Sequence, residues 1–185
     1  MILRTCAALL VWAGLGPAGA QTPQTGAQQS PPPPACDAPL HRQFDFWIGD
    51  WDVFGGPGGT SIVGRNTITP VASGCALREH WVNTGGRDGH SLNAYDRDAK
   101  AWTQFWIGSD GVILRLHGGL RADGAMAMEG ALPDGKGGMQ RQRIVWMPLP
   151  DGRVEQRWDT SDDDGASWQT SFVGLYRRRT PDATP

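Results

Sequence analysis

Residues 101–118 read AWTQFWIGSDGVILRLHG, two short segments rich in aromatic and β-branched residues that flank Asp110-Gly111. An Asp-Gly pair tolerates the positive φ of a tight hairpin turn. Because successive side chains of a strand point to opposite faces, Trp102, Gln104 and Trp106 share one face of the first segment. This stretch therefore predicts an antiparallel β-hairpin.

The same alternation of segment and turn continues in both directions along the chain. Further Asp-Gly pairs stand at Asp88-Gly89, Asp123-Gly124, Asp134-Gly135, Asp151-Gly152 and Asp164-Gly165. Strands are expected near residues 46–54, 60–69, 76–83, 91–96, 101–108, 112–118, 125–132, 139–148, 153–160 and 167–177. No stretch keeps the helical period of about 3.6 residues, so little helix is expected.

These expected strands place the chain in the all-β class. About ten short antiparallel strands joined by hairpins can close into an up-and-down β-barrel, which leaves no exposed sheet edge. A two-sheet β-sandwich fits the same strands and is the alternative. Charged residues are only 19% of the 185, and the net charge is −2. This composition excludes a charge-rich coiled coil and a basic nucleic-acid-binding protein.

The start of the chain has the three parts of a secretory signal peptide over residues 1–20. Arg4 supplies the positive charge, residues 7–15 are apolar, and small residues lead up to Ala20. A buried N-terminal helix is the alternative. The apolar run is shorter than the ~20 residues of a membrane-spanning helix, and no later segment is more apolar, so no transmembrane segment is predicted.

The next part of the chain, residues 21–35, is rich in Gln, Thr and Pro and ends in four consecutive prolines. Such a composition is typical of a flexible linker. We therefore expect a single β-barrel domain over residues 36–179 and a disordered tail at 180–185. The expected location is exported, either periplasmic or secreted.

Two cysteines, Cys36 and Cys75, would remain after removal of the signal peptide. In an oxidising compartment two such cysteines most simply pair. Closing a loop of this length would stabilise the fold by about 3.5–4 kcal/mol in the chain-entropy description. Two free buried thiols are the alternative. We predict a Cys36–Cys75 disulfide.

Several expected strands carry large aromatic and polar side chains on the same face. A purely structural core would use Leu, Ile and Val, which leave no polar group to satisfy, whereas a ligand cavity combines aromatic walls with a few polar groups. Alternation does not tell which face is inward, and the polar side chains of one face can instead satisfy one another. The candidate ligand-binding residues are Glu79, Trp81, Ser91, Asn93, Tyr95, Trp102, Gln104, Trp106, Gln156 and Trp158.

The most distinctive segment is residues 44–53, FDFWIGDWDV, in which Gly49 allows a neighbouring group to approach closely. Its Gly49-Asp50-Trp51 resembles the Gly-x-Trp of the first strand of lipocalins and related calycin barrels. The resemblance implies that Trp51 closes one barrel end beneath an arginine of the last strand. Arg177, Arg178 or Arg179 would supply this cation.

A wider pattern continues from this segment through Cys75 to the polar and aromatic strands around residues 91–106. It resembles an uncharacterised family of exported bacterial proteins, which implies a calycin-like barrel without an established activity. Nitrobindin-type haem barrels resemble it more distantly, and in them a histidine near the C-terminus binds the iron. This chain departs from them because its last histidine is His117. We therefore predict no cofactor.

Residues 161–168, SDDDGASW, fit the Asp-box pattern Ser-x-Asp-x-Gly-x-Ser/Thr-Trp. Asp163 is expected to accept backbone hydrogen bonds within the turn, Gly165 to allow the bend, and Trp168 to cover the base of the hairpin. A single copy cannot build a propeller. The spacing of a calcium-binding EF-hand loop is also missing, so a solvated structural turn is predicted.

Support for catalysis in the sequence is thin. The histidines after the signal peptide, at positions 41, 80, 90 and 117, show no metal-ligand spacing, so no metal site is predicted. Nucleophile, phosphate-loop and dinucleotide motifs are missing. Glu79 is the best candidate for a functional acid, and a buried Glu79 is expected to pair with Arg143 or Arg115.

The leading hypothesis is an exported barrel that binds a small, partly apolar ligand of unknown identity without chemistry. No nucleic acid is expected among its partners. The second hypothesis is a cell-envelope interaction module that docks a partner protein through exposed tryptophans and the proline-rich arm. The third is a barrel hydrolase or isomerase that uses Glu79 as general acid or base.

Overall fold

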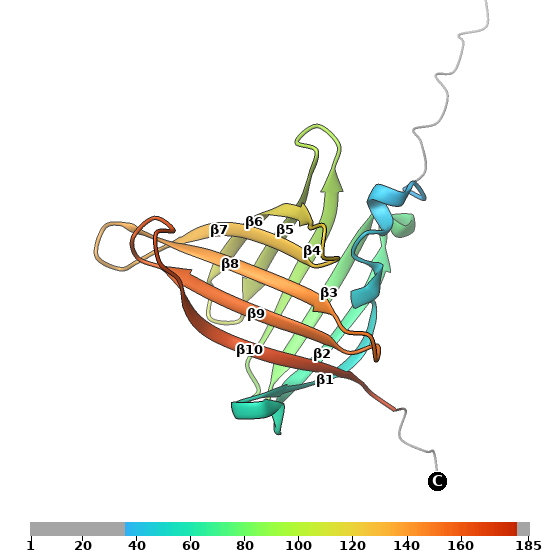
Figure 1. The fold of residues 1–185 in the computed structure, drawn as a ribbon, viewed down its shortest axis with the longest axis horizontal. Coiled ribbons are helices and arrows are strands. Elements are labelled where there is room, and N and C mark those ends of the chain that lie inside the picture. The colour runs from blue at the N-terminus through green and yellow to red at the C-terminus, as the bar shows by residue number, and fades with distance from the viewer. Residues whose placement is uncertain (1–35, 181–185) are drawn as a thin grey trace, which may run out of the picture. The chain divides into compact units, whose positions relative to one another are not determined.

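The computed structural model of the chain describes residues 36–180, which fold into one barrel (Figure 1). The predicted signal peptide at 1–20 and linker at 21–35 lie outside the described residues, as do residues 181–185 of the predicted tail. Among the described residues, no helix is long and apolar enough to cross a bilayer.

Ten antiparallel strands follow one another around the barrel in chain order. They are β1 Gly49–Gly55, β2 Ser61–Val71, β3 Ala76–Asn83, β4 Asp88–Asp96, β5 Ala101–Gly108, β6 Ile113–Leu120, β7 Met126–Pro133, β8 Met139–Pro148, β9 Val154–Ser161 and β10 Gln169–Arg178. Each strand pairs with the next, and β1 pairs with β10, so the sheet closes on itself. The predicted up-and-down barrel is confirmed, and the two-sheet sandwich is excluded.

Five of the six Asp-Gly pairs lie in turns, where their glycines have a positive φ of 73–94°. The prediction for Asp88-Gly89 is wrong, because these residues begin β4, three residues earlier than expected. The turn lies before them, where Asn83 Oδ1 accepts hydrogen bonds from the N–H groups of Gly85 and Arg87. Gly89 serves packing, because a Cβ added there would lie 2.3 Å from the Trp106 ring.

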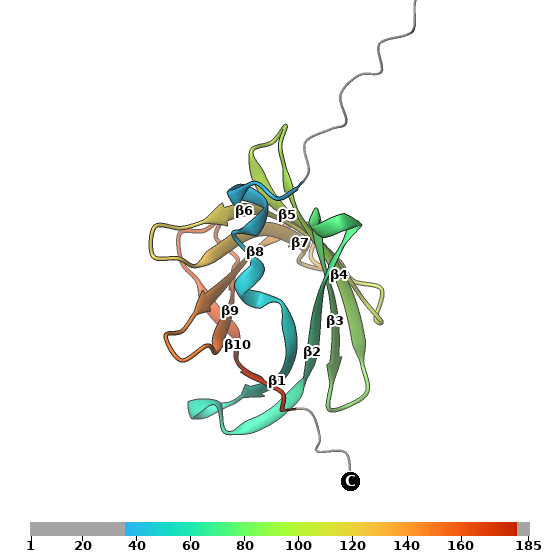
Figure 2. The same ribbon diagram turned by 90° about the vertical axis from the view of Figure 1, so that its right-hand side faces the viewer.

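The expected first strand at 46–54 also begins later than predicted. Its start belongs to an irregular segment with two 3₁₀ turns, η1 Pro39–Arg42 and η2 Asp45–Trp47. Two further short 3₁₀ turns, η3 Pro57–Gly59 and η4 Ala72–Gly74, flank β2. The η1–η2 segment lies across one opening of the barrel (Figure 2).

The η1–η2 segment is attached to the barrel by packing and by a covalent bond. Phe44 and Trp47 are fully buried and stack with ring centroids 4.8 Å apart. Phe44 also meets the edges of Trp102 and Trp146 at 5.7 and 5.2 Å. Such aromatic pairs contribute about 0.5–1.5 kcal/mol beyond the burial of their area. These contacts close this end of the barrel.

The predicted disulfide is present and joins Cys36, before η1, to Cys75, before β3. Arg42 reinforces the same junction by donating hydrogen bonds to the carbonyl oxygens of Cys36 and Gly74. A disulfide is compatible with an oxidising compartment.

Of the three arginines considered, Arg178 lies over the Trp51 ring, with its guanidinium carbon 4.4 Å from the ring centroid. Arg178 also donates a hydrogen bond to the Ile48 carbonyl oxygen. A Cβ at Gly49 would collide with this guanidinium, which explains the glycine beside the tryptophan.

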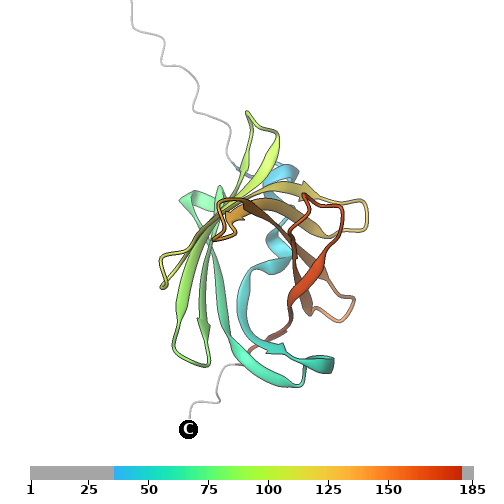
Figure 3. The same ribbon diagram turned by 90° about the vertical axis from the view of Figure 1, so that its left-hand side faces the viewer.

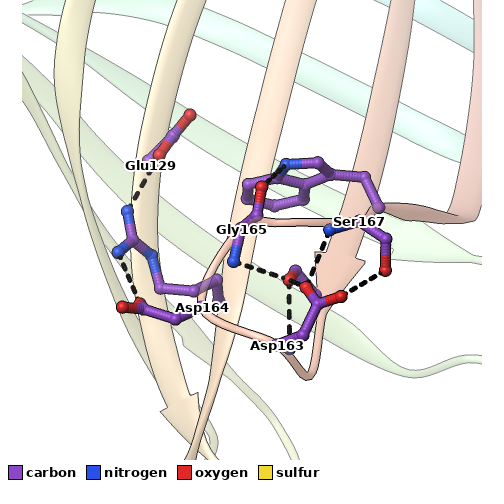
Figure 4. Close-up of polar contacts among 8 residues, drawn as sticks. Glu129, Asp163, Asp164, Gly165 and Ser167 are labelled. Carbon is purple, nitrogen blue, oxygen red and sulfur yellow. Dashed lines mark hydrogen bonds and ion pairs between the residues drawn. The ribbon is translucent and has the colours of Figure 1, made fainter.

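The β7–β8 and β9–β10 connections lie on the side of the barrel opposite the η1–η2 segment (Figure 3). In the β9–β10 connection the Asp163 carboxylate accepts hydrogen bonds from the N–H and the hydroxyl of Ser167 (Figure 4). Trp168 Nε1 donates to the Gly165 carbonyl oxygen, and the Arg143 guanidinium lies over the Trp168 ring at 4.0 Å. The roles predicted for Asp163, Gly165 and Trp168 in this turn are confirmed.

Arg141 of β8 ties this turn to the neighbouring hairpin. Its guanidinium forms 3.1 Å ion pairs with Asp164 in the turn and with Glu129 of β7 (Figure 4).

The hydrogen bonds from Ser167 and Ser161 lower the pKa of Asp163 to about 2.

Candidate ligand-binding cavity

The inside of the barrel contains a cavity of about 270 Å³. It is lined by Glu79, Trp81, Gln104, Trp106, Leu114, Ile144, Trp146, Gln156, Trp158, Ser171, Phe172 and Tyr176. These residues come from β3, β5, β6, β8, β9 and β10, so walls on several sides of the barrel contribute. The lining combines aromatic rings with amide, carboxyl and hydroxyl groups, which is the composition of a small-molecule site.

The cavity is closed at the barrel end that the η1–η2 segment covers, and it is open toward the opposite end. Trp146 and Tyr176 are 1% exposed, and Trp146 packs against Trp47 of the η1–η2 segment at 5.4 Å. Trp81 and Trp106 lie near the last residues of β3 and β5 and are half-buried. The cavity therefore reaches the surface away from the η1–η2 segment.

Glu79 places a carboxyl group in the wall of the cavity and is itself buried. Its Oε1 accepts a 2.7 Å hydrogen bond from Asn66 Nδ2, and its Oε2 accepts a 2.6 Å bond from Ser91 Oγ. Burial raises the pKa of Glu79 because it penalises the charged form, and these two hydrogen bonds oppose that effect.

The predicted pairing of Glu79 with Arg143 or Arg115 is wrong. Arg143 lies on the outer face of β8, where it binds Asp159 at 3.2 Å. Arg115 lies over Phe105, also on the outer face, with its guanidinium carbon 5.1 Å from the ring centroid. Both arginines have the opposite strand parity from the residues that line the cavity, so their side chains point out of the barrel.

On one side of Glu79 the hydrogen bonds continue through three further polar side chains. Asn93 Nδ2 donates to Ser91 Oγ at 2.8 Å, and Gln104 Nε2 donates to Asn93 Oδ1 at 2.8 Å. All three side chains are buried. Their order leaves Gln104 Oε1 without a hydrogen-bond partner among residues 36–180.

On the other side of Glu79 the chain of hydrogen bonds crosses to the last strands. Asn66 Nδ2 also donates to the Tyr176 hydroxyl at 3.2 Å, and this hydroxyl donates to Gln156 Oε1. Burial, and then the nearby Glu79 charge, raise the pKa of Tyr176, so its hydroxyl stays a donor. Gln156 Nε2 has no hydrogen-bond partner within the described chain.

Two fully buried polar atoms near the cavity lack partners within residues 36–180. They are Asn66 Oδ1 and Trp146 Nε1, of which Trp146 lines the cavity directly. Buried polar atoms are nearly always hydrogen-bonded in folded proteins, so these two atoms are exceptions. In contrast, Trp158 Nε1 is satisfied by Gln142 Oε1 at 2.8 Å.

Six of the ten residues predicted for the site line the cavity: Glu79, Trp81, Gln104, Trp106, Gln156 and Trp158. Ser91 and Asn93 do not line the cavity. Instead, Ser91 donates a hydrogen bond to Glu79, and Asn93 accepts one from Gln104. Tyr95 and Trp102 share the inward face but lie at the closed end. There, Tyr95 packs against His41 at 5.7 Å, and Trp102 Nε1 donates to Gln43 Oε1 at 3.0 Å.

The sequence prediction missed six lining residues: Leu114, Ile144, Trp146, Ser171, Phe172 and Tyr176. Most of them have the strand parity of the cavity face in β6, β8 and β10. Trp146, two residues after Ile144 in β8, carried the clearest signal. The same alternation that selected Trp102 and Trp106 would have selected it.

A separate group of side chains meets on the outside of the barrel. His80 of β3 lies directly opposite His90 of β4, and Asp88 lies on the same outer face. The sequence prediction found no metal-ligand spacing among the histidines, and it started the fourth strand at residue 91. With β4 beginning at Asp88, the histidines become cross-strand neighbours.

Comparisons with known proteins add no assignment for either site. A scan against models of protein families finds no match to this chain, and a search of curated proteins also finds none.

Proposed function

We propose that this barrel binds a small, partly apolar molecule in its cavity and carries out no chemistry on it. The observation that carries the proposal is the hydrogen-bonded chain from Gln104 to Gln156, which runs behind an aromatic-walled cavity. A barrel that needed only a stable core would not bury a carboxyl and several amides, because each must be satisfied at a cost.

The chain of hydrogen bonds leaves opposite polar groups facing a ligand. Gln104 Oε1 is an acceptor, whereas Gln156 Nε2 is a donor. The hydrogen bond to Asn93 and the hydrogen bond from the Tyr176 hydroxyl orient the Gln104 and Gln156 amides. The fitting ligand therefore carries both a donor and an acceptor at its polar end.

The apolar part of the ligand is limited by the size and shape of the cavity. A volume of about 270 Å³ lies just below the 300–1,000 Å³ typical of sites for drug-sized molecules. The rings of Trp81, Trp106 and Trp158 are the walls against which a flat or short apolar body would pack. A compact ring compound fits this description better than a long acyl chain.

We further propose that the protein acts outside the cytoplasm. The Cys36–Cys75 disulfide supports an oxidising location, and the signal-peptide pattern of residues 1–20 supports export. The position of Arg178 over the Trp51 ring resembles the pair that closes one end of lipocalin-type barrels.

A second candidate function is a hydrolase or isomerase that uses Glu79 as general acid. The raised pKa of a carboxyl group in a cavity favours it. However, both Glu79 oxygens already accept hydrogen bonds from Asn66 and Ser91, which suits an orienting role. The interaction module gains no such support, because all eight tryptophans within residues 36–180 are buried or half-buried.

Native mass spectrometry of protein exported into a periplasm tests the proposal. We expect a non-covalent adduct that disappears on denaturation. Gln104→Met keeps the side-chain volume but removes its polar groups, and it should abolish the adduct. Gln169→Met changes an exposed glutamine of β10 and should retain the adduct. A bare monomer mass in the wild type, or equal adducts in both variants, would contradict ligand binding at Gln104.

A further inference from the structure

The outer face of the β3–β4 hairpin brings together two imidazoles and a carboxylate. The rings of His80 and His90 are stacked, with centroids 4.3 Å apart and an interplanar angle of 11°. Asp88 Oδ2 lies 3.7 Å from His80 Nε2 and 3.9 Å from His90 Nε2. The three ligand atoms all lie within 4.8 Å of one another.

We propose that His80, Asp88 and His90 form a binding site for a divalent transition-metal ion of the zinc class. Two imidazole nitrogens and one carboxylate oxygen are the donor set that zinc accepts, usually with a fourth position left for water or another ligand. Calcium and magnesium prefer oxygen ligands, so this donor set selects against them.

The spacing of the three groups agrees with this donor set. Ligand atoms bound at about 2.0–2.2 Å around a tetrahedral zinc ion lie about 3.3–3.6 Å apart. The distances from Asp88 to the two imidazoles exceed this range by only a few tenths of an ångström. The two imidazole rings are stacked nearly parallel, so they must also rotate about their Cβ–Cγ bonds to direct a nitrogen from each at one ion. All three side chains are 43–51% exposed, so an ion can reach them from solvent.

The backbone that carries the three ligands is held in place. His80 and His90 are directly opposite each other in the β3–β4 pairing, whose register runs from Ala76↔Ala94 to Val82↔Asp88. Ser109, in the β5–β6 turn, accepts a hydrogen bond from the Asp88 N–H through its hydroxyl and donates its own N–H to the Asp88 carbonyl oxygen. The ligands therefore stand on rigid strands, which favours a precise site.

The proposed metal site is separate from the cavity. The neighbouring residues Trp81 and Gly89 have the opposite strand parity and face the inside of the barrel. A metal ion at His80 and His90 would thus be separated from the cavity by the sheet itself. Loss of metal binding and loss of cavity binding can be measured separately.

Calorimetric titration with Zn²⁺ tests the site on the full chain, purified without a polyhistidine tag. We expect one ion to bind, and His80→Gln, His90→Gln and Asp88→Asn each to weaken binding at least about tenfold, since even residues that only support a ligand cost 10–100-fold. The matched control is His117→Gln, which removes an exposed histidine of β6 that contacts Thr103. This control should bind Zn²⁺ as the wild type does.

A second measurement protects the result from a folding artefact. In an imidazole ¹H–¹⁵N NMR spectrum, Zn²⁺ should shift the signals of two histidines in the wild type and leave those of His41 and His117 in place. Absence of binding up to millimolar Zn²⁺ would overturn the proposal. Unchanged affinity in the folded His80→Gln and His90→Gln variants would overturn it too.

Discussion

Ser91 Oγ donates a 2.6 Å hydrogen bond to Glu79 Oε2 between directly opposed positions of β3 and β4. Both side chains are buried, and the carboxyl has no cation within reach of its oxygens among the described residues. The fold thus keeps this acid in place with neutral donors alone. Neutral donors only partly offset the loss of hydration, and the pKa of Glu79 remains raised.

The raised pKa of Glu79 predicts that stability falls as pH rises. The folded protein retains a proton on Glu79 that the unfolded chain releases above its ordinary pKa of about 4.3. The free energy of unfolding should therefore decrease from about pH 4.3 upwards, by up to about 1.4 kcal/mol per pH unit, until the folded-state pKa is passed. Glu79→Gln should remove this decrease.

Urea unfolding of the wild type and the Glu79→Gln variant between pH 4.5 and 8 measures the effect. Glu155→Gln is the control, because Glu155 is exposed on β9. If Glu79→Gln and Glu155→Gln show the same pH dependence, the carboxyl group is not buried as described.

The lowered pKa of Asp163 predicts the opposite dependence at lower pH, where stability falls as pH falls. Its folded-state pKa of about 2 lies below the ordinary value of about 3.9. The stability that it contributes is present above pH 3.9 and is lost as pH falls through about 2. Asp163→Asn should therefore show a smaller loss of stability across this window. Circular dichroism during acid titration measures it, with the exposed Asp98→Asn as a control that should behave like the wild type.

Strand parity carried most of what could be predicted from sequence. The alternation of Trp102, Gln104 and Trp106 predicted that the three share one face of the strand, and in the structure all three side chains point into the barrel. Parity does not say how far along the barrel a residue lies. For that reason Trp102 was assigned to the ligand site, although it packs beneath the η1–η2 segment.

The remaining features depend on relationships that the sequence does not display. Phe46 and Trp47 fit a strand pattern locally, yet the chain turns inward there because Trp47 can be fully buried among Phe44 and Trp146. The His80–His90 pair depends on the hairpin register, which the Asn83 turn sets. A search for turns that treated Asn83 like the Asp-Gly pairs would have paired these histidines.

The disulfide predicts a large dependence of stability on redox state. Cys36 and Cys75 are 39 residues apart, and opening this loop should lower the free energy of unfolding by about 3.5–4 kcal/mol. Denaturant unfolding of the Cys36→Ser/Cys75→Ser variant against the oxidised wild type measures this. Because the bond attaches the η1–η2 segment, the variant should also show red-shifted tryptophan fluorescence from partial exposure of Trp47. An unchanged unfolding midpoint would show that packing alone holds the segment.

Gly89 predicts a link between backbone packing and the cavity. A Cβ at this position would lie 2.3 Å from the Trp106 ring and 3.0 Å from the Ile107 carbonyl oxygen. A rigid indole cannot absorb such a contact locally, so Gly89→Ala must displace Trp106, which lines the cavity. Overpacking of this kind costs about 1–3 kcal/mol of stability.

Because it displaces Trp106, Gly89→Ala also tests ligand binding in the cavity without changing any of the cavity's polar groups. The variant should unfold at lower urea concentration and bind the native adduct more weakly, although no hydrogen-bonding group has been removed. Gly119→Ala in β6 is the matched control, because a Cβ there meets no atom within 4 Å. It should leave both properties unchanged. Equal effects of the two substitutions would mean that the cost comes from the glycine backbone and not from the Trp106 ring.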